Sequence, residues 1–368
     1  MSLKKNKKIV LYIDTMERGG AQRVLVNLME HYVDNDIDVV LINDFKLSSN
    51  VSKYNVPNKV KRYFLRDGLE GNKIFKNIER VINLRKIVMK ENPDVVLSFL
   101  GSCNKRMLIG TIGLKTRKIV SVRNDPNYEY ARSGLSKFFA RNIFKLADGV
   151  VFQTKDASSY FPKCVVNKST IILNPVDLKF YNVKRDDNPK NIVTAGRLFP
   201  QKNQKLLIEA FSKICDEFKD DNLIFYGEGS LRQELLDLCK NLHIENRVSL
   251  PGNVDNVEQM LSKAKIFVLT SNFEGLPNAL MEAMAMGLPC ISTDCPCGGP
   301  RTLIDNDISG KLVRVGDIDE LANVLRDVLN DSEKQKMFAT NARCKADEFK
   351  PSIILKKWDK YLFNGDIC

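Results

Sequence analysis

Short apolar runs rich in β-branched residues alternate along the chain with longer segments that carry apolar residues at helical spacing. In the first half these runs are residues 8–14, 37–43, 94–100, 117–123 and 150–155. Between them, stretches such as GAQRVLVNLMEHYV are typical of amphipathic helices. Strands that alternate with helices form βαβ units, so the pattern predicts a parallel sheet with helices on both faces.

The alternation stops once and then begins again. Residues 171–191 contain two prolines and several Asn and Asp residues, a composition typical of a linker. Further apolar runs follow at 191–197, 222–229, 264–271, 288–293 and 311–315. We therefore expect two doubly wound α/β domains, residues 1–176 and 177–350, which bind ligands at the carboxyl ends of their strands across a cleft. Residues 351–368 are expected to form a helix and tail that packs back on the first domain.

Composition is that of a soluble globular protein, with 43% hydrophobic and 28% charged residues in a chain of 368. No apolar run reaches the roughly 18 residues of a membrane-spanning helix, and the one that ends before Asp14 is too short for a secretion signal. The nine scattered cysteines favour a reducing cytosol. Cys295 and Cys297 have no histidine nearby, so we interpret them as structural thiols and expect no metal site.

The net charge of +12 is uneven, with +15 in residues 1–176 and −3 in residues 177–368. So basic a first domain should attract phosphate groups, whether of a nucleic acid, an anionic lipid or a lipid-linked pyrophosphate. The charge asymmetry alone does not choose among these three partners.

Two glutamates eight residues apart, Glu274 and Glu282, lie in FEGLPNALMEAMAMGLP. We expect a helix over residues 278–286 that begins near Pro277, with Glu274 in the loop beside the unpaired N–H groups of its first turn. Glu282 lies among small apolar residues, and a buried carboxylate needs a partner. The alternative is that Glu274 only stabilises the helix dipole while Glu282 is solvated.

Loops that follow other predicted strands carry groups suited to a nucleotide. Arg197 and Lys202, in GRLFPQKNQ, could hold a diphosphate and stabilise charge that develops on it. Residues 252–254 follow a short strand, where backbone groups could contact a base. Gly19 and Gly20 could let a phosphate approach the first helix. The glycine spacing does not match GxGxxG, so no redox cofactor is expected.

Six segments complete the pattern, namely GGAQRV, ILNPVD, AGRLFPQKN, YGEGSLR, LPGNVDNV and FEGLPNALMEAMAMGLPCISTD. In this order they resemble the retaining nucleotide-sugar glycosyltransferases of family 4, across nearly the whole chain. The resemblance implies the glycosyltransferase B fold, two Rossmann-like domains that face each other across a cleft. It also implies a nucleotide-sugar donor, with UDP the commoner nucleotide in the family, and no metal or other cofactor. Residues 305–307 match a metal-binding DxD only by letters and are interpreted as a turn.

The resemblance assigns the matching residues to the two ends of one ligand. Glu274 would meet the transferred sugar, and Glu282 would hold the ribose hydroxyls. Arg197 and Lys202 would grip the leaving diphosphate, which Gly20 would approach from the first domain. The other implied donor contacts are Gly275, Leu276, Asn278, Ala279, Asn253 and Val254.

The chain departs from the family at one position. Many members carry a histidine after the strand that corresponds to KIVSV, where this chain has Arg123. Arg123 could contact a phosphate or the acceptor, but it is a poor general base. A departing phosphate that takes the acceptor proton would need no protein base. Double displacement on Glu274, as in retaining glycosidases, is the alternative.

The basic, amphipathic segment 72–90 gives an indication of the kind of acceptor. Its expected apolar stripe consists of Ile74, Ile78, Val81, Ile82 and Val88, and the basic residues among them are Lys73, Lys76, Arg80, Lys86 and Lys90. One interpretation is a core-packed helix with a solvated basic face. The other is a surface for anionic lipid or for the pyrophosphate of a polyprenyl-linked saccharide. Family members often extend such acceptors, so we expect a cytoplasmic protein bound peripherally to the inner face of the membrane.

Two other classes of function are compatible with parts of this sequence. A nucleotide-sugar epimerase can share the two-domain fold, and it would change its nucleotide sugar without any acceptor. A basic nucleic-acid-binding protein would suit the sequence pI of about 9.1. However, the basic residues are not interleaved with aromatic ones into a stacking platform, so no nucleic-acid partner is expected.

Overall fold

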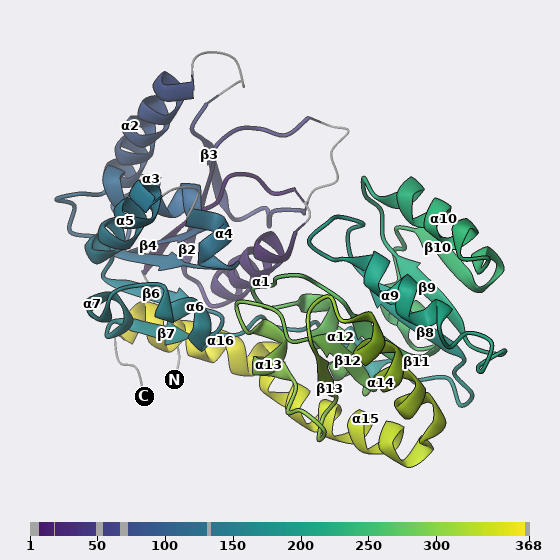
Figure 1. Cartoon of the computed structure of the whole chain (residues 1–368). Coiled ribbons are helices and arrows are strands. Elements are labelled where there is room, and N and C mark those ends of the chain that lie inside the picture. The colour runs from purple at the N-terminus through teal and green to yellow at the C-terminus, as the bar shows by residue number, and fades with distance from the viewer. Residues whose placement is uncertain (1–6, 18, 49–53, 67–72, 131–133, 365–368) are drawn as a thin grey trace. The chain divides into compact units, whose positions relative to one another are not determined.

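The computed structural model describes residues 7–17, 19–48, 54–66, 73–130 and 134–364. The chain divides into two compact units, of which unit 1 comprises residues 1–175 and 352–368 and unit 2 comprises residues 176–351. Each unit has a parallel β-sheet with helices packed against it (Figure 1).

The described residues of unit 1 form a seven-stranded sheet of order β3-β2-β1-β4-β5-β6-β7, in which every pair of neighbouring strands is parallel. The strands are β1 (Lys8–Tyr12), β2 (Asp38–Asn43), β3 (Lys61–Phe64), β4 (Val95–Phe99), β5 (Arg117–Ser121), β6 (Gly149–Phe152) and β7 (Ser169–Ile171). The central strands are buried apolar runs because helices cover both of their faces.

Helices join most of these strands, as is usual for parallel connections. They are α1 (Gly20–Asp34), α2 (Lys73–Glu91), α3 (Gly101–Gly110), α4 (Pro126–Tyr130), α5 (Gly134–Ile143), the 3₁₀ turn η1 (Phe144–Leu146), α6 (Lys155–Ser159) and α7 (Lys163–Val166). In α1, side chains at helical spacing are buried, namely Val24, Leu25, Leu28, Met29 and Tyr32.

The sheet of unit 2 has the order β10-β9-β8-β11-β12-β13 and is also parallel. Its strands are β8 (Asn191–Ala195), β9 (Asn222–Tyr226), β10 (Val248–Gly252), β11 (Ala264–Leu269), β12 (Cys290–Thr293) and β13 (Lys311–Val313). Its helices are α8 (Lys179–Asn182), α9 (Gln204–Ser212), α10 (Arg232–Asn241), α11 (Val257–Leu261), α12 (Asn278–Ala285), α13 (Gly299–Leu303), α14 (Ile318–Asn330) and α15 (Ser332–Ala346), with the 3₁₀ turns η2 (Glu245–Arg247) and η3 (Asp347–Phe349).

The prediction of two α/β domains with parallel sheets is confirmed, and the chain passes from unit 1 to unit 2 after residue 175, inside the stretch 171–191 that was expected to be a linker. Of residues 171–191, Phe180 and Tyr181 in α8 are buried, and the Tyr181 hydroxyl donates a hydrogen bond to the Ala346 carbonyl oxygen at 2.5 Å. The stretch is therefore a mostly irregular connection, part of which packs against unit 2 through α8.

The segment after residue 351 belongs to unit 1. It forms α16 (Pro351–Asp359) and the π-helical turn η4 (Lys360–Asn364). Trp358 is fully buried and stacks on Phe99 with ring centroids 6.0 Å apart. The Tyr361 hydroxyl accepts a hydrogen bond from the Val150 amide at 2.7 Å, and His31 of α1 lies 3.0 Å from the Asp359 carboxylate.

We expect Trp358→Ala to lower the free energy of unfolding by about 3–5 kcal/mol, because it leaves a cavity in the core of unit 1. Trp358→Phe should cost much less, since the indole N–H makes no hydrogen bond to any described residue. Urea denaturation of both variants checks this, and equal unfolding midpoints for wild type and Trp358→Ala would contradict it.

Candidate active site

The candidate donor site of unit 2 lies where the strand order reverses. Strand β8 is the first strand of this sheet along the chain, and it pairs with β9 on one side and with β11 on the other. Successive connections leave such a switch point in opposite directions, which opens a crevice at the carboxyl ends of the two strands. The loops at this crevice are residues 196–203, after β8, and residues 270–277, after β11.

Lys202 and Glu274, from these two loops, are in direct contact. The Lys202 Nζ lies 2.5 Å from the Glu274 Oε1, which also accepts a hydrogen bond from the Ser271 hydroxyl at 2.6 Å. Glu274 is only 6% exposed. No described residue donates a hydrogen bond to its second oxygen, Oε2. The ion pair thus compensates the charge of the buried carboxylate through Oε1. The other oxygen, Oε2, can still accept a hydrogen bond from a ligand.

Further hydrogen bonds tie the two loops together. The Asn272 amide N–H donates to the Gln201 carbonyl oxygen at 2.8 Å, and the Asn272 side-chain amide donates to the Pro200 carbonyl oxygen at 3.0 Å. The Thr270 hydroxyl donates to the Lys202 carbonyl oxygen at 3.1 Å. The position of the Lys202–Glu274 pair is therefore fixed by the backbone as well as by charge.

Two glycines allow close backbone approach at this edge. A Cβ atom on Gly299 would lie 1.8 Å from the carbonyl oxygen of Gly275, beside Glu274. A Cβ atom on Gly227 would lie 2.0 Å from the carbonyl oxygen of Gly196, and Gly227 has a φ of +142°. Both positions exclude a side chain, so GEG at 227–229 is built into the crevice and is not an exposed turn.

Helix α12 follows the Glu274 loop nearly as expected, with Pro277 as its N-cap residue and Gly287 in the left-handed region just beyond its end. No side chain caps its N-terminus. Gly275 and Leu276 are buried, while Asn278 and Ala279 of the first turn are half-buried. Glu282 is buried in the middle of the helix, so the alternative of a solvated Glu282 is wrong.

The other predicted donor contacts are spread along the same sheet edge. Arg197 is exposed and lies over the Phe199 ring, 5.3 Å from its centroid. Asn253 is exposed and Val254 is half-buried, and both follow β10 at the edge of the sheet. The ends of β8, β9 and β10 are joined by hydrogen bonds from the Gly196 amide to the Tyr226 oxygen and from the Gly227 amide to the Gly252 oxygen, both at 2.9 Å.

Gly19, Gly20 and Arg123 lie in unit 1. Gly19 is the extended N-cap residue of α1 and Gly20 is its exposed first residue. Arg123, which follows β5, is buried against the Phe99 ring and donates hydrogen bonds to the Asn174 side-chain oxygen and the Ser121 hydroxyl. Burial lowers the pKa of its guanidinium to about 9, so it stays charged at neutral pH. It forms no ion pair with a described residue.

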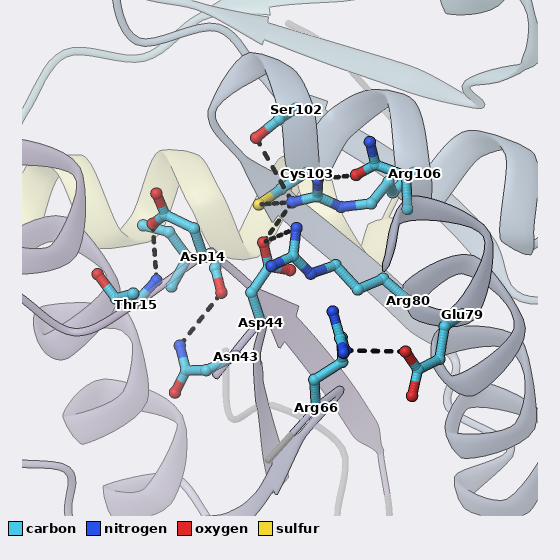
Figure 2. A network of polar contacts seen from close by, with 12 residues as sticks. Asp14, Thr15, Asn43, Asp44, Arg66, Glu79, Arg80, Ser102, Cys103 and Arg106 are labelled. Carbon is cyan, nitrogen blue, oxygen red and sulfur yellow. Dashed lines mark hydrogen bonds and ion pairs between the residues drawn. The ribbon is translucent and has the colours of Figure 1, made fainter. Parts of the chain in front are cut away.

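A network that the sequence analysis missed lies at the corresponding edge of unit 1 (Figure 2). The buried Asp44, which follows β2, accepts hydrogen bonds from Arg106 of α3 at 2.6 Å and from the Tyr12 hydroxyl at 2.7 Å. Arg80 of α2 lies 3.7 Å from the same carboxylate. The available signal was the pair Asn43–Asp44 directly after an apolar run. The network ties α2 and α3 to the sheet.

Helix α2 differs from the expected apolar stripe. Its buried face holds Leu84 and Val88, whereas Ile78 and Ile82 are half exposed. With Phe75, which is 72% exposed, and Met89 they form an apolar stripe on the outer face. Arg80 points inward to Asp44 and does not join the outer basic residues Lys86 and Lys90. The helix is therefore neither simply core-packed nor polar on its exposed side.

In the described residues, no three His, Cys, Asp or Glu side chains are grouped so as to hold a metal ion. Residues 305–307 form the expected turn, in which the Asp307 amide donates to the Gly310 carbonyl oxygen at 2.9 Å. No described helix is long and apolar enough to cross a membrane.

Comparison with known proteins assigns both units. Residues 18–180 match the family model described as Glycosyltransferase Family 4, and residues 177–345 match the one described as Glycosyl transferases group 1. The two models together span residues 18–345, so the chain carries both domains of these glycosyltransferases, and its fold is the glycosyltransferase B fold. The comparisons do not favour the epimerase or nucleic-acid-binding alternatives.

One relative, from Campylobacter jejuni, is an α-1,4-N-acetyl-D-galactosaminyltransferase that acts on a diphosphoundecaprenol-linked saccharide, 29% identical over 96% of this chain and 98% of its own. An Escherichia coli UDP-Gal:α-D-GlcNAc-diphosphoundecaprenol α-1,3-galactosyltransferase is 24% identical over 85% of each chain. Among solved structures, Anabaena HepE in complex with UDP has a TM-score of 0.80 and 18% identity, over 97% of this chain and 100% of its own.

We expect Lys202→Met to lower the free energy of unfolding by about 3–5 kcal/mol, because it leaves the Glu274 carboxylate buried without its cation. Adding Glu274→Gln should restore most of the loss, since a neutral amide needs no counter-charge. Urea denaturation measures both. A single variant as stable as the wild type would contradict the stabilising role of the pair.

Proposed function

We propose that this protein is a retaining hexosyltransferase that moves a hexose or N-acetylhexosamine from a UDP-sugar to a saccharide on polyprenyl diphosphate, in the assembly of a bacterial surface glycan. The main support for a donor site in unit 2 is the Lys202–Glu274 contact at the switch point of its sheet. The acceptor class and UDP are supported by the names of the Campylobacter and E. coli relatives.

The diphosphate of the donor would lie between Arg197, Lys202 and the N-terminus of α12. Arg197 and the uncapped backbone N–H groups would bind the diphosphate, together with the Lys202 ammonium, which is shared with Glu274. These groups carry the charge stabilisation that a metal ion supplies in other transferases, so we propose a metal-independent reaction. Glu282 would hold the ribose hydroxyls, with the backbone of Asn253 and Val254 beside the base.

Glu274 would accept a hydrogen bond from a hydroxyl of the transferred sugar through its Oε2. Lys202 and Ser271 both bind Oε1 and withdraw charge from the carboxylate, which makes it a weaker nucleophile. This favours attack by the acceptor hydroxyl on the same face as the departing diphosphate. The bond from the anomeric carbon to the diphosphate oxygen breaks, the bond to the acceptor oxygen forms, and that hydroxyl's proton passes to the diphosphate. Double displacement on Glu274 remains the second candidate mechanism.

Arg123 would bind phosphate in unit 1. It keeps its charge at neutral pH although it is buried, and its described side-chain partners, Ser121 and Asn174, are neutral. A buried cation with neutral partners is stabilised by an anion. A phosphate of the donor or acceptor supplies that anion, whereas a guanidinium with a pKa of about 9 is unsuited to the role of a general base.

Helix α2 would bind the membrane surface. Its outer stripe of Phe75, Ile78, Ile82 and Met89 exposes large apolar side chains, and Lys86 and Lys90 stand beside them. Apolar residues flanked by lysines are typical of helices that lie in the interface of an anionic bilayer. This supports a cytoplasmic protein held peripherally at the inner face of the membrane, where a polyprenyl-linked acceptor is anchored.

UDP should raise the melting temperature of the wild type more than GDP or ADP, because a ligand that binds only the folded state stabilises it. At 100 times Kd the gain is about 2.7 kcal/mol. Glu282→Ala should reduce the response, and Glu234→Ala, on the exposed side of α10, should not. A thermal-shift assay tests this, and a full response in Glu282→Ala would remove Glu282 from the site.

Transfer from a UDP-sugar to a polyprenyl-diphosphate-linked saccharide should fall about 10²-fold in kcat in Arg197→Gln, through loss of charge stabilisation on the leaving group. Arg197 is exposed, so folding should be unaffected, and Lys219→Gln is a control of equal charge change. NMR of the product gives its anomeric configuration. A product of inverted configuration would overturn the retaining mechanism, and no transfer to any lipid-linked saccharide would overturn the acceptor class.

A further inference from the structure

Helix α5 exposes aromatic side chains on the surface of unit 1. Phe138 is 68% exposed and Phe139 is 53% exposed, and Leu146 in the following turn η1 is also exposed. The opposite side of the helix is anchored, because Ala140 and Ile143 are buried. The two phenylalanines are thus held outward by a fixed helix.

A cavity of about 340 Å³ opens beside Phe138. Its lining residues are Gly134, Lys137, Phe138, Arg141, Asn142, Lys145 and Pro162. Three of these are cationic and none is a carboxylate. The volume lies at the lower end of the range of small-molecule sites, about 300–1,000 Å³.

The three cations of this cavity have no counter-ion among the residues that the structure describes. Lys137 and Arg141 are four residues apart, on one face of α5, and Lys145 follows after four more. None of them forms an ion pair with any residue in the described part of the chain, and the Lys137 ammonium lies over the Tyr160 ring, 5.3 Å from its centroid. Like charges at this spacing repel each other. An anion bound among them would remove that cost.

The exposed aromatic residues identify the source of the anion. A soluble phosphate would gain nothing from Phe138, Phe139 and Leu146, whereas a phospholipid offers a phosphate and an apolar boundary next to it. Helix α3 packs against both α2 and α5, so both helices belong to the same layer of unit 1 (Figure 1). The apolar stripe of α2 is aliphatic apart from Phe75, which suits acyl chains better than stacked bases.

We propose that the α5 cavity binds the phosphate of an anionic phospholipid headgroup while Phe138 and Phe139 enter the headgroup–acyl boundary. This gives unit 1 a second membrane contact besides α2, and the inference rests on the proposed membrane association. Lys137, Arg141 and Lys145 make the contact selective for negative lipid, and the phenylalanines make part of the binding resistant to salt.

The test is co-sedimentation of the full chain with vesicles of phosphatidylcholine that contain 30% phosphatidylglycerol or none. The cavity variant is Lys137→Gln with Arg141→Gln and Lys145→Gln. Its matched control removes the same charge from exposed lysines of unit 2, by Lys190→Gln with Lys219→Gln and Lys263→Gln. We expect the cavity variant to lose more than tenfold in affinity for the anionic vesicles, and the control less than threefold. Circular dichroism confirms that both variants fold.

A second pair of variants separates the apolar contribution. Phe138→Ser with Phe139→Ser should weaken the binding that persists in 0.5 M NaCl and leave the part that the apolar stripe of α2 contributes. The inference is overturned if the cavity variant binds anionic vesicles as the control does, or if it loses affinity equally for random single-stranded oligonucleotide.

Variants of α2 distinguish failure of this inference from failure of the proposed membrane association. If Phe75→Ser with Ile82→Ser abolishes vesicle binding while the cavity variant retains it, α2 alone docks the protein and the cavity assignment falls. If the wild type binds no anionic vesicle, both membrane proposals fall. The UDP response of the melting temperature, which is measured without lipid, then still decides the donor site independently.

Discussion

The parallel pairing of every strand is the constraint on which the rest of the structure depends. Each connection between parallel strands must cross back over the sheet, so all strands of one sheet end at the same edge. The loops after β8 and β11 are about seventy residues apart in sequence, yet the sheet places them next to each other. Because β8 is the strand at which the order reverses, no crossover covers the crevice between them, and polar groups can remain there open to a ligand.

The same constraint acts in unit 1 but with a different outcome. Strands β1 and β4 meet where the order reverses, and the edge beside them carries Asp44 with the guanidinium of Arg106. Here the single Asp44 carboxylate is held by two guanidinium groups, those of Arg106 and Arg80. The network holds α2 by Arg80 on its inner side and so fixes which side faces outward. A buried ion pair is weak evidence for stability, but it is well suited to set the orientation of an element.

The sequence was sufficient for the strands that are apolar on both faces, because β-branched runs bounded by polar residues have few other interpretations. It failed for β3 and β7, whose residues are half-buried or exposed at the sheet edges, so that KRYF and STI carry no apolar run. The Glu274 loop and the start of α12 were predictable from Pro277 and Gly287. The contact of Glu274 with Lys202 was not, since it depends on strand order. The sequence likewise did not reveal that Arg80 points inward. Helical spacing shows which residues share a face of the helix, but not which face packs against the sheet.

The last helix has a consequence for how the protein is made. Unit 1 is built from residues at both ends of the chain, and Trp358 and Tyr361 occupy positions in its core that nothing else fills. A ribosome that has finished residue 175 must translate all of unit 2 before α16 exists, which takes roughly 10–35 s at about 5–20 residues per second. Throughout that interval Phe99 lacks the Trp358 ring that stacks on it in the complete chain. Unit 2 is contiguous and can fold first, so the core of unit 1 is completed only after unit 2 has been made, and a chaperone has the same interval in which to bind unit 1.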